Sequence, residues 1–469
     1  MNQTPKLKKG QTLPITIETL VFGGQGLGKA ENGQKVFVDG TVPGDTVEVR
    51  VNKVKSGYAE AKRMTILKAS PLRVEPKCRH FDTCGGCKWQ FLSYEDQLKF
   101  KEQQVKDSME RLAELPGDLV LPILPNESPW NYRNKMDLSF GTGPDGKVML
   151  GFYPPGFHFE VFNLTECHLM NDWMGSFVSE FRDFVNSRWW KVFNTESGEG
   201  LLRNLMIREG KNTGDVMVSL ITSHEHFPKG TDDLSALIDW MKARGNISSF
   251  YLSKITQKKG QATKQKEVLL FGKKTLTESL KLENGNELFF DILPQAFFQT
   301  NTRQAEKLYT RVLELAGLTG KEIVMDLYCG TGTIGLFCAH KAKQVIGVEL
   351  NASAVDNARA NAARNSISNA EFFLGDTERV LENHTENGDF PKPDVIIVDP
   401  PRNGLGPNVV HQCADLAAKT IVYVSCNPTT LARDLKSFAK LGYTCELVQP
   451  VDMFPQTYHV ECIAKLTRS

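Results

Sequence analysis

The run IVYVSCNPTT, residues 421–430, places a cysteine directly after an apolar, β-branched segment and directly before Asn-Pro. The apolar run is typical of a buried strand, and Asn-Pro forces the chain out of it. Cys426 is therefore expected at the carboxyl end of a strand, the edge where open α/β sheets bind ligands. Because a free cysteine is more often a small buried hydrophobe, this run alone leaves a nucleophile and a core residue as alternatives.

Carboxylates accompany two other apolar runs. In DPPR, residues 399–402, Asp-Pro-Pro follows DVIIV and builds a rigid, extended ledge, although an ordinary turn after a strand has the same pattern. In HVECIAKL, residues 459–466, Glu461 stands among apolar residues, where a carboxylate is costly unless it is paired or faces a site. Burial would raise its pKa toward that of a general base; the alternative is a glutamate in water at a strand edge.

The segment DLYCGTGTIG, residues 326–335, contains the spacing G-x-G-x-x-G between a predicted strand and a predicted helix. Glycines are needed where a ligand approaches a turning backbone. Glu349 ends the next predicted strand, where a carboxylate can accept both hydroxyls of a ribose. These features fit NAD or S-adenosylmethionine (SAM). Asp326 at the start of the loop and the chemical motifs downstream favour SAM.

Three cysteines crowd into PKCRHFDTCGGCKWQ with the spacing C-x5-C-x2-C, at Cys78, Cys84 and Cys87. Cys167, in LTECHLM, is a candidate fourth ligand. Four thiolates bind either a structural zinc ion or an iron–sulfur cluster, and the spacing by itself slightly favours zinc. Ten cysteines in 469 residues are too few for a disulfide scaffold, so metal is the stronger interpretation.

The elements that must position these residues differ along the chain. From about residue 295 onward, apolar β-branched runs alternate with helical stretches, which predicts a parallel sheet with helices on both faces. Residues 11–70 form short alternating segments between glycine turns, which favours a small barrel of the oligonucleotide-binding kind or a generic β domain with a basic face. Residues 93–116 predict a helix that Pro-Gly ends, and residues 120–290 a mixed, strand-rich region with an aromatic core.

Composition and charge bound the class of protein. The chain is 41% hydrophobic and 24% charged, with no long apolar stretch, so we expect a cytoplasmic protein without membrane contact. The net charge is only +1, but residues 1–70 carry eleven Lys or Arg against six Asp or Glu, a local footprint for nucleic acid. The basic loop 254–266 either touches phosphate or is a solvated hairpin tip.

With these residues assembled, the chain resembles the RNA uracil-5 methyltransferase family, and more closely its ribosomal-RNA branch. The motifs PQAFFQTN (residues 294–301), DLYCGTGTIG, DPPRNG, SCNP and HVEC occur in the family's order. The N-terminal segment looks like a TRAM domain that runs into the family's cluster motif. The resemblance covers nearly the whole chain.

The resemblance implies an α/β fold with three parts. These are a C-terminal Rossmann-like SAM methyltransferase domain, an N-terminal OB-like β-barrel (TRAM), and a mixed, strand-rich central domain that carries an iron–sulfur cluster. The implied boundaries are residues 1–70 (TRAM), 71–92 with 120–293 (central domain), 93–119 (a helix that packs on the catalytic domain) and 294–469 (catalytic domain).

The resemblance also implies the site residues. Cys426 would be the nucleophile and Glu461 the proton acceptor, and the four cysteines would hold a [4Fe-4S] cluster. The SAM and substrate site would be formed by Gln299, Tyr328, Thr333, Glu349 and Asp399. Several relatives carry asparagine at the position of Thr333, whose hydroxyl still offers SAM a hydrogen bond.

The implied activity is methyl transfer from SAM to carbon 5 of a specific uridine, favoured in 23S ribosomal RNA, through a covalent cysteine adduct at carbon 6. The cluster would have a structural or RNA-positioning role. A transfer-RNA target is one alternative. Another is a SAM-dependent RNA methyltransferase of different chemistry, such as one acting on an exocyclic amine, which would need neither Cys426 nor Glu461. RNA is the expected partner, no obligate protein partner is evident, and a monomer is expected.

Overall fold

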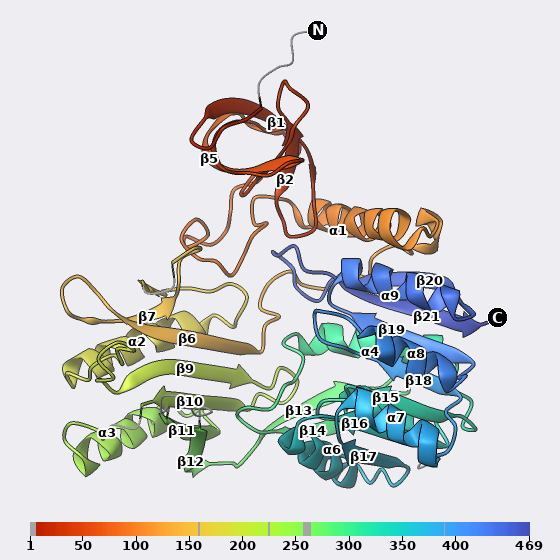
Figure 1. The fold of residues 1–469 in the computed structure, drawn as a ribbon. Coiled ribbons are helices and arrows are strands. Elements are labelled where there is room, and N and C mark those ends of the chain that lie inside the picture. Colours follow the sequence, from red (N-terminus) through yellow and green to blue (C-terminus); the bar gives the residue numbers. More distant parts are fainter. Residues whose placement is uncertain (1–5, 158–159, 224–225, 257–263, 389) are drawn as a thin grey trace.

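The computed structural model describes residues 6–157, 160–223, 226–256, 264–388 and 390–469. A β-barrel lies at one end of the molecule, a long helix lies beneath it, and two large sheets stand side by side below (Figure 1). Among the described helices, none is both long and apolar enough to cross a membrane.

The N-terminal barrel closes in the strand order β1-β2-β3-β5-β4. Its strands are β1 Thr12–Leu20, β2 Gly26–Lys29, β3 Lys35–Val38, β4 Thr46–Val54 and β5 Tyr58–Lys68. Alternate residues such as Val47, Val49 and Val51 point into a small apolar core, while the residues between them face outward. The expected small barrel is confirmed, with its lysines and arginines on the outer face.

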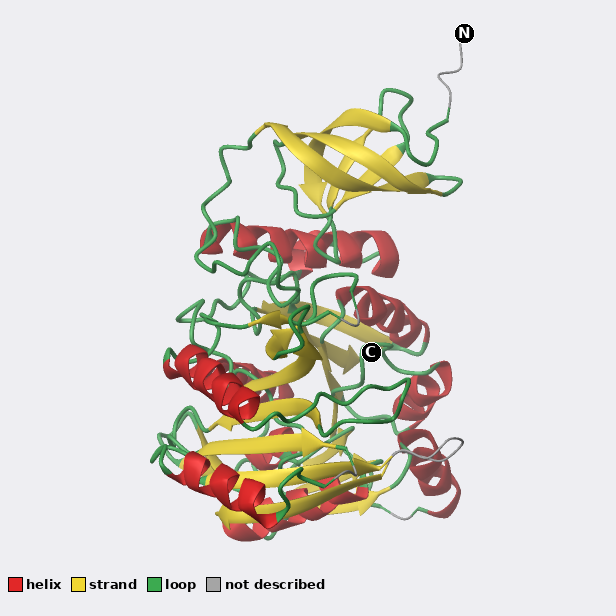
Figure 2. Cartoon of the chain, turned by 90° about the vertical axis from the view of Figure 1, so that its left-hand side faces the viewer, coloured by secondary structure: helices red, strands yellow, loops and turns green. Residues whose placement is uncertain are grey.

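Helix α1, Tyr94–Ser108, separates the barrel from the rest of the molecule (Figure 2). The Ser93 hydroxyl caps it by accepting a hydrogen bond from the Asp96 backbone N–H at 3.1 Å. The helix ends in a π-turn, η1 Met109–Ala113, before Pro-Gly is reached, and a short 3-10 turn, η2 Gly117–Leu119, follows.

The 93–124 segment packs on the C-terminal sheet. Val105 and Met109 are fully buried in one apolar cluster with the strands and outer helices of that sheet, whereas Leu112 is 46% exposed. Beyond the helix, isolated bridges pair Val120 and Leu124 with one strand of the same sheet, β20, Tyr443–Val451.

The central region is a seven-stranded sheet in the order β12-β11-β10-β9-β6-β7-β8. Its strands are β6 Lys135–Thr142, β7 Val148–Phe152, β8 Phe162–Asn163, β9 Leu202–Glu209, β10 Val216–Thr222, β11 Ser249–Thr256 and β12 Lys264–Gly272. Helices α2, Trp173–Ser187, and α3, Thr231–Lys242, pack on it around an aromatic core, as the sequence predicted. The tip of the basic loop, residues 257–263, lies outside the described residues. A hairpin of β13, Leu276–Lys281, and β14, Glu287–Ile292, leads to the last domain.

The C-terminal domain is a second seven-stranded sheet, in the order β17-β16-β15-β18-β19-β21-β20. Its strands are β15 Ile323–Leu327, β16 Gln344–Glu349, β17 Ala370–Leu374, β18 Val395–Val398, β19 Thr420–Ser425, β20 Tyr443–Val451 and β21 Glu461–Arg468. The first five are parallel, and β21 runs antiparallel to both its neighbours.

Helices cover both faces of this sheet, which confirms the predicted doubly wound α/β domain. On one face lie α4 Thr302–Ala316, α5 Thr333–Ala339 and α6 Ala352–Arg364. On the other lie α7 Thr377–Asn387, α8 Pro407–Asp415 and α9 Pro428–Lys440.

Candidate active site

Three neighbouring strands bring the predicted site residues to one edge of the C-terminal sheet. β15, β18 and β19 are adjacent and parallel, so their carboxyl ends meet at the same edge. Tyr328, Asp399 and Cys426 are the residues that directly follow these strands. The sheet order therefore gathers side chains that lie almost 100 residues apart in the sequence.

Strand β21 supplies the fourth group. Ser425 pairs with Cys462 at the end of the antiparallel ladder of β19 and β21, and Cys426 and Glu461 are the residues that continue this register by one step. The electrostatic effect of Glu461 on the Cys426 thiol agrees with their being close. Side chains opposite each other in such a ladder have Cβ atoms about 4.5–5.5 Å apart. Glu461 is only 5% exposed, which excludes the alternative of a solvated glutamate at a strand edge.

Local sequence explains why Cys426 stands at a sharp turn. Asn427 caps helix α9 by accepting hydrogen bonds from the backbone N–H and the hydroxyl of Thr429, and Pro428 occupies the first helical position. The Asn427 side chain also donates to the carbonyl of Arg402 at 3.2 Å. Asn427 thus follows the end of the strand, caps the helix and holds the DPPR segment beside Cys426 through a hydrogen bond.

The DPPR segment is anchored from behind by Asp434. One of its carboxylate oxygens accepts hydrogen bonds from the Tyr423 hydroxyl at 2.7 Å and the Leu405 backbone N–H at 2.8 Å. Gly404 has φ +72°, and a Cβ there would lie 2.6 Å from the same oxygen, so only glycine fits. The ledge expected from the two prolines is therefore held against helix α9.

Burial shifts the ionisation of the groups at this edge. Burial, reinforced by the nearby charge of Asp399, raises the pKa of Glu461 to about 8, while Arg402 acts in the opposite direction. Burial likewise raises the pKa of Asp399 to about 7. The pKa of the Cys426 thiol is raised to about 11 by burial and by the two carboxylates. The cysteine is thus not activated by a lowered pKa in the free protein, and a neighbouring base is required.

The glycine loop connects β15 to α5, and each of its glycines is required for a different structural reason. A Cβ at Gly332 would lie 2.8 Å from the Phe372 ring, and one at Gly335 would lie 2.9 Å from the Asp326 carboxylate. Gly330, with φ +55°, faces open space and leaves room for a ligand. The Gly330 N–H donates to Glu349 at 3.1 Å, which fixes that carboxylate at the tip of β16.

Three other predicted residues flank this loop. Tyr328 has φ +63°, and its hydroxyl interacts with Thr377, so its ring is held at the strand end. The Tyr309 hydroxyl donates to the Thr333 hydroxyl at 3.4 Å. Gln299 is half-buried, and its backbone carbonyl accepts a hydrogen bond from the Asn134 side chain at 2.8 Å.

Sequence reasoning missed two residues at this edge. Phe297 is 65% exposed although the next residue of the run PQAFFQTN, Phe298, is buried. The Thr331 hydroxyl donates to the Phe297 carbonyl. Arg402 acts electrostatically on both Cys426 and Glu461. The sequence contained a signal for each residue. Two consecutive phenylalanines in an extended segment point in opposite directions, so only one of them can face the core. Arg402 is the last residue of the DPPR motif.

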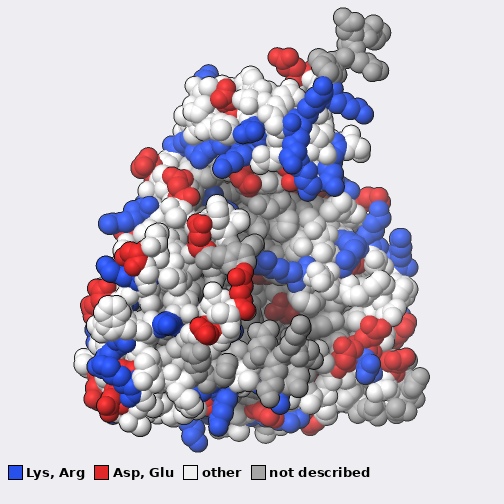
Figure 3. All heavy atoms as spheres, turned by 60° about the vertical axis from the view of Figure 1, so that its left-hand side comes forward, with Lys and Arg blue, Asp and Glu red and all other residues white. Residues whose placement is uncertain are grey.

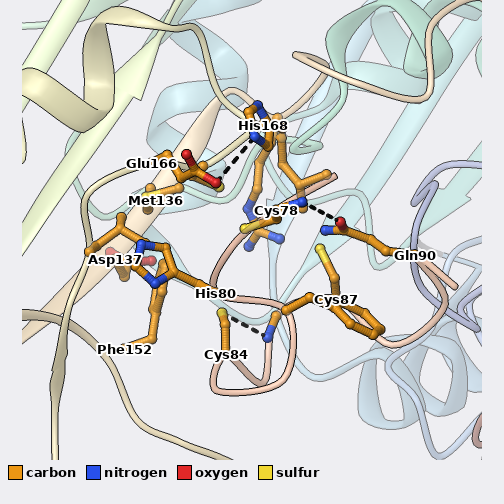
Figure 4. A pocket seen from close by; sticks show the side chains of 16 residues that line it. Cys78, His80, Cys84, Cys87, Gln90, Met136, Asp137, Phe152, Glu166 and His168 are labelled. Carbon is orange, nitrogen blue, oxygen red and sulfur yellow. Dashed lines mark hydrogen bonds and ion pairs between the residues drawn. The ribbon is translucent and has the colours of Figure 1, made fainter. Parts of the chain in front are cut away.

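The four predicted metal ligands line one cavity of about 170 Å³ between the 78–90 loop and the central sheet (Figure 4). Backbone hydrogen bonds order this loop. The Gly86 N–H donates to the Cys84 sulfur, and the Cys78 N–H donates to the Gln90 side chain. Among the described residues, no group of three or more His, Cys, Asp or Glu side chains is arranged to hold one metal ion.

The thiols in this cavity disfavour ionisation in the free protein. Burial raises the pKa of Cys84 to about 11 and that of Cys87 to about 12, and the neighbouring thiols add to both shifts. A cationic group would reverse this, because thiolates are stabilised by metal. Four sulfur donors on one cavity therefore suit either an iron–sulfur cluster or a zinc ion in chemical type.

Basic side chains gather over the barrel and reach the edge of a recess beneath it (Figure 3). Arg50, Lys62 and Lys68 are among the exposed residues of β4 and β5. This surface matches the local charge excess seen in the sequence and is suited to a polyanion.

The sheet order, the glycine loop and the acidic residue at the tip of β16 define a methyltransferase-type α/β protein with an added β-barrel. Sequence models of two families match the chain: tRNA (uracil-5-)-methyltransferase at residues 214–469, and the TRAM domain at residues 6–63. The chain belongs to the RNA uracil-5 methyltransferase family and is an RNA methyltransferase.

Full-length relatives agree with this assignment. Proteins of Clostridium tetani and Chlorobaculum tepidum, both named as uncharacterized RNA methyltransferases, are each 37% identical over all of this chain and 98% of their own length. The crystal structure of Pyrococcus abyssi tRNA (uracil-54, C5)-methyltransferase in complex with S-adenosyl-L-homocysteine covers 97% of this chain and all of its own, with 30% identity and a TM-score of 0.76.

Proposed function

We propose that this protein transfers a methyl group from SAM to carbon 5 of a uridine in 23S ribosomal RNA, through a covalent adduct between Cys426 and carbon 6. The observation that carries the proposal is the adjacency of β19 and β21, whose paired ends Ser425 and Cys462 are followed and preceded by Cys426 and the buried Glu461 at the ligand-binding edge of the sheet. A methyltransferase acting on an exocyclic amine needs neither group.

The proposed mechanism follows from the poor nucleophilicity of carbon 5. The Cys426 thiolate adds to carbon 6, and the electron pair of the C5–C6 double bond moves to form an enolate. Carbon 5 then attacks the SAM methyl group, and S-adenosylhomocysteine leaves. Glu461 removes the proton from carbon 5, the double bond re-forms, and the thiolate is expelled from carbon 6.

Glu461 is suited to the last step because it is buried yet capable of ionising near neutral pH. With a pKa of about 8, it is a stronger base than an exposed glutamate, and it is near enough to Cys426 for its charge to raise the pKa of the thiol. Arg402 opposes the rise and provides a positive charge near the site where the enolate forms.

The cofactor site is proposed at the glycine loop. Glu349, fixed by Gly330, would accept the ribose hydroxyls of SAM, and the open space at Gly330 admits the cofactor to the backbone. Tyr328 and Thr333 would line the same cleft. Gln299 and Asp399 would bind the polar edge of a flipped-out uracil, with Phe297 available to stack on the base.

For the cysteine cavity we propose a [4Fe-4S] cluster held by Cys78, Cys84, Cys87 and Cys167. The support is the shared cavity and the four-sulfur donor set. When bound, the cluster would fix the 78–90 loop; the methyl transfer itself has no redox step. The central domain that carries this site is proposed to comprise residues 71–92 and 120–293.

A transfer-RNA target is the second candidate. The Pyrococcus abyssi enzyme is named as a tRNA methyltransferase and aligns along nearly this whole chain, so the same architecture serves transfer RNA in that protein. The choice between the two substrates rests on the RNA surface of the barrel and central domain, which recognises shape and phosphate.

The test uses 5-fluorouridine RNA with SAM and protein purified without oxygen. Fluorine cannot leave as a proton does, so a carbon-5 enzyme should remain covalently bound to the RNA. We expect the adduct with wild-type protein, its loss in Cys426→Ala, and mapping to 23S ribosomal rather than transfer RNA. Methylation of ordinary RNA without any trapped adduct on an accepted substrate would overturn the cysteine mechanism.

A further inference from the structure

The segment Asp452–Tyr458, between β20 and β21, is held almost entirely by groups from distant parts of the chain. Each of its carbonyls from residue 453 to 456 accepts a hydrogen bond from outside the segment. The donors are Asn301 to Met453, Lys101 to Phe454, Tyr132 to Pro455, and the backbone N–H groups of Lys88 and Trp89 to Gln456. Within the segment, the Thr457 backbone N–H and hydroxyl also donate to the Phe454 carbonyl. Most of the hydrogen bonds to these carbonyls nevertheless come from the surroundings.

A buried ion pair fixes its first residue. The Lys101 ammonium, on helix α1, lies 2.5 Å from an Asp452 carboxylate oxygen, and both side chains are completely buried. Burial lowers the pKa of Lys101, and the charge of Asp452 opposes that shift. A buried pair adds little net stability over an apolar one of equal volume, so its value lies in the position it imposes.

A second contact fixes the turn. The side chains of Gln97 and Gln456 meet: Gln97 donates to the Gln456 side chain at 3.0 Å, and the Gln456 backbone N–H donates to Gln97 at 2.8 Å. Gln456 has φ +68°, a conformation that a non-glycine residue keeps only when its surroundings impose it. Helix α1 therefore supplies both residues that hold the segment, Gln97 and Lys101, which lie one helical turn apart.

The contacts of Gln97 and Lys101 lie close in the chain to Glu461, the proposed base. Val451 is the partner of Glu461 in the ladder of β20 and β21, and Asp452 is the residue that directly follows it. The Asp452–Tyr458 segment forms most of the connection between the two strands, residues 452–460, so its conformation influences how the chain enters β21 at Glu461.

We propose that Lys101, supported by Gln97, is a positioning residue for Glu461 and controls the last step, the removal of the carbon-5 proton and release of the RNA. This inference rests on the proposed function. It assigns helix α1 a role in the reaction through its contacts with the Asp452–Tyr458 segment.

The test separates methyl transfer from release, using ordinary uridine RNA and radiolabelled SAM in a single turnover. Lys101→Met keeps the length of the side chain and removes its charge. We expect methyl transfer within about threefold of wild type, but release slowed at least about tenfold, so that methylated RNA accumulates covalently on the protein. Lys99→Met is the matched control, because Lys99 lies on the same helix and is 74% exposed.

Two further variants keep the test decisive. Gln456→Asn keeps a residue that tolerates positive φ, but its side chain is shorter and loses the hydrogen bond from the Gln97 side chain. This variant should also accumulate adduct, and it serves as the test if Lys101→Met does not fold. Glu461→Gln should accumulate adduct whatever the role of Lys101. Accumulation in Glu461→Gln without accumulation in folded Lys101→Met or in Gln456→Asn would overturn this inference alone. Absence of any adduct, with 5-fluorouridine as well, would overturn the proposed function instead.

Discussion

The pH dependence of adduct release tests the role of Glu461 most directly. Burial raises the pKa of this carboxyl to about 8, above the ordinary value, so the group keeps its proton at neutral pH and becomes a base as pH rises. With that pKa, about 9% of the group is ionised at pH 7 and about 91% at pH 9. The release rate should therefore rise about tenfold across this interval and level off above it.

The assay forms the methylated adduct at pH 6.5, where release is slow, and then jumps the pH to values between 6.5 and 9.5. Denaturing gels follow the protein-bound RNA over time. Glu461→Gln, which has no ionisable group there, should release slowly and with a flat pH profile. A wild-type release rate that does not change with pH, or an equal rise in Glu461→Gln, would refute the assignment of Glu461 as the base.

Three other expectations follow from the structure. Glu349→Ala should weaken SAM binding by about tenfold or more in calorimetry, since a hydrogen bond to a charged group contributes about 1.5–3 kcal/mol; unchanged affinity would place the ribose elsewhere. Val105→Ala should lower the free energy of unfolding by about 1–3 kcal/mol, whereas Leu112→Ala, 46% exposed, should change it by less than about 0.5 kcal/mol; equal effects in urea unfolding would contradict the packing of helix α1 on the catalytic sheet. Cys84→Ser should lose the visible absorbance of an iron–sulfur cluster and unfold at a lower temperature, while chemical reduction of the intact cluster should leave methyl transfer unchanged; activity that follows cluster potential would refute the structural role.

The architecture was predictable from the sequence because its signals are local and periodic. Alternation with glycine turns predicted the barrel, and alternating β-branched and helical runs predicted the doubly wound sheet. Motifs at predicted strand ends placed Cys426 and Asp399 at one edge, since parallel strands share that edge whatever their order.

Other features depend on tertiary contacts and left no local signal. Nothing in the sequence around Glu461 identifies its partner, because its closeness to Cys426 is set by pairing of β19 with a strand 36 residues further along. The end of helix α1 also depends on tertiary contacts: its π-turn replaces the expected run to Pro-Gly, and Leu112 in that turn is exposed. The sequence predicts Lys101 to be an ordinary exposed lysine of a helix, and only the fold shows that it is buried against Asp452.

The raised pKa values at the carboxyl edge explain why the site is built from several weakly ionised groups. Burial and the charges of Glu461 and Asp399 disfavour the Cys426 thiolate, so a free thiolate is rare before substrate arrives. In the proposed reaction SAM would bring a positive sulfonium group to this edge, where the Arg402 guanidinium already favours the thiolate. We therefore expect the thiolate to form mainly when SAM is bound. The carboxyl that opposes the thiolate at the start of the proposed reaction is the same group that we propose to accept a proton at its end.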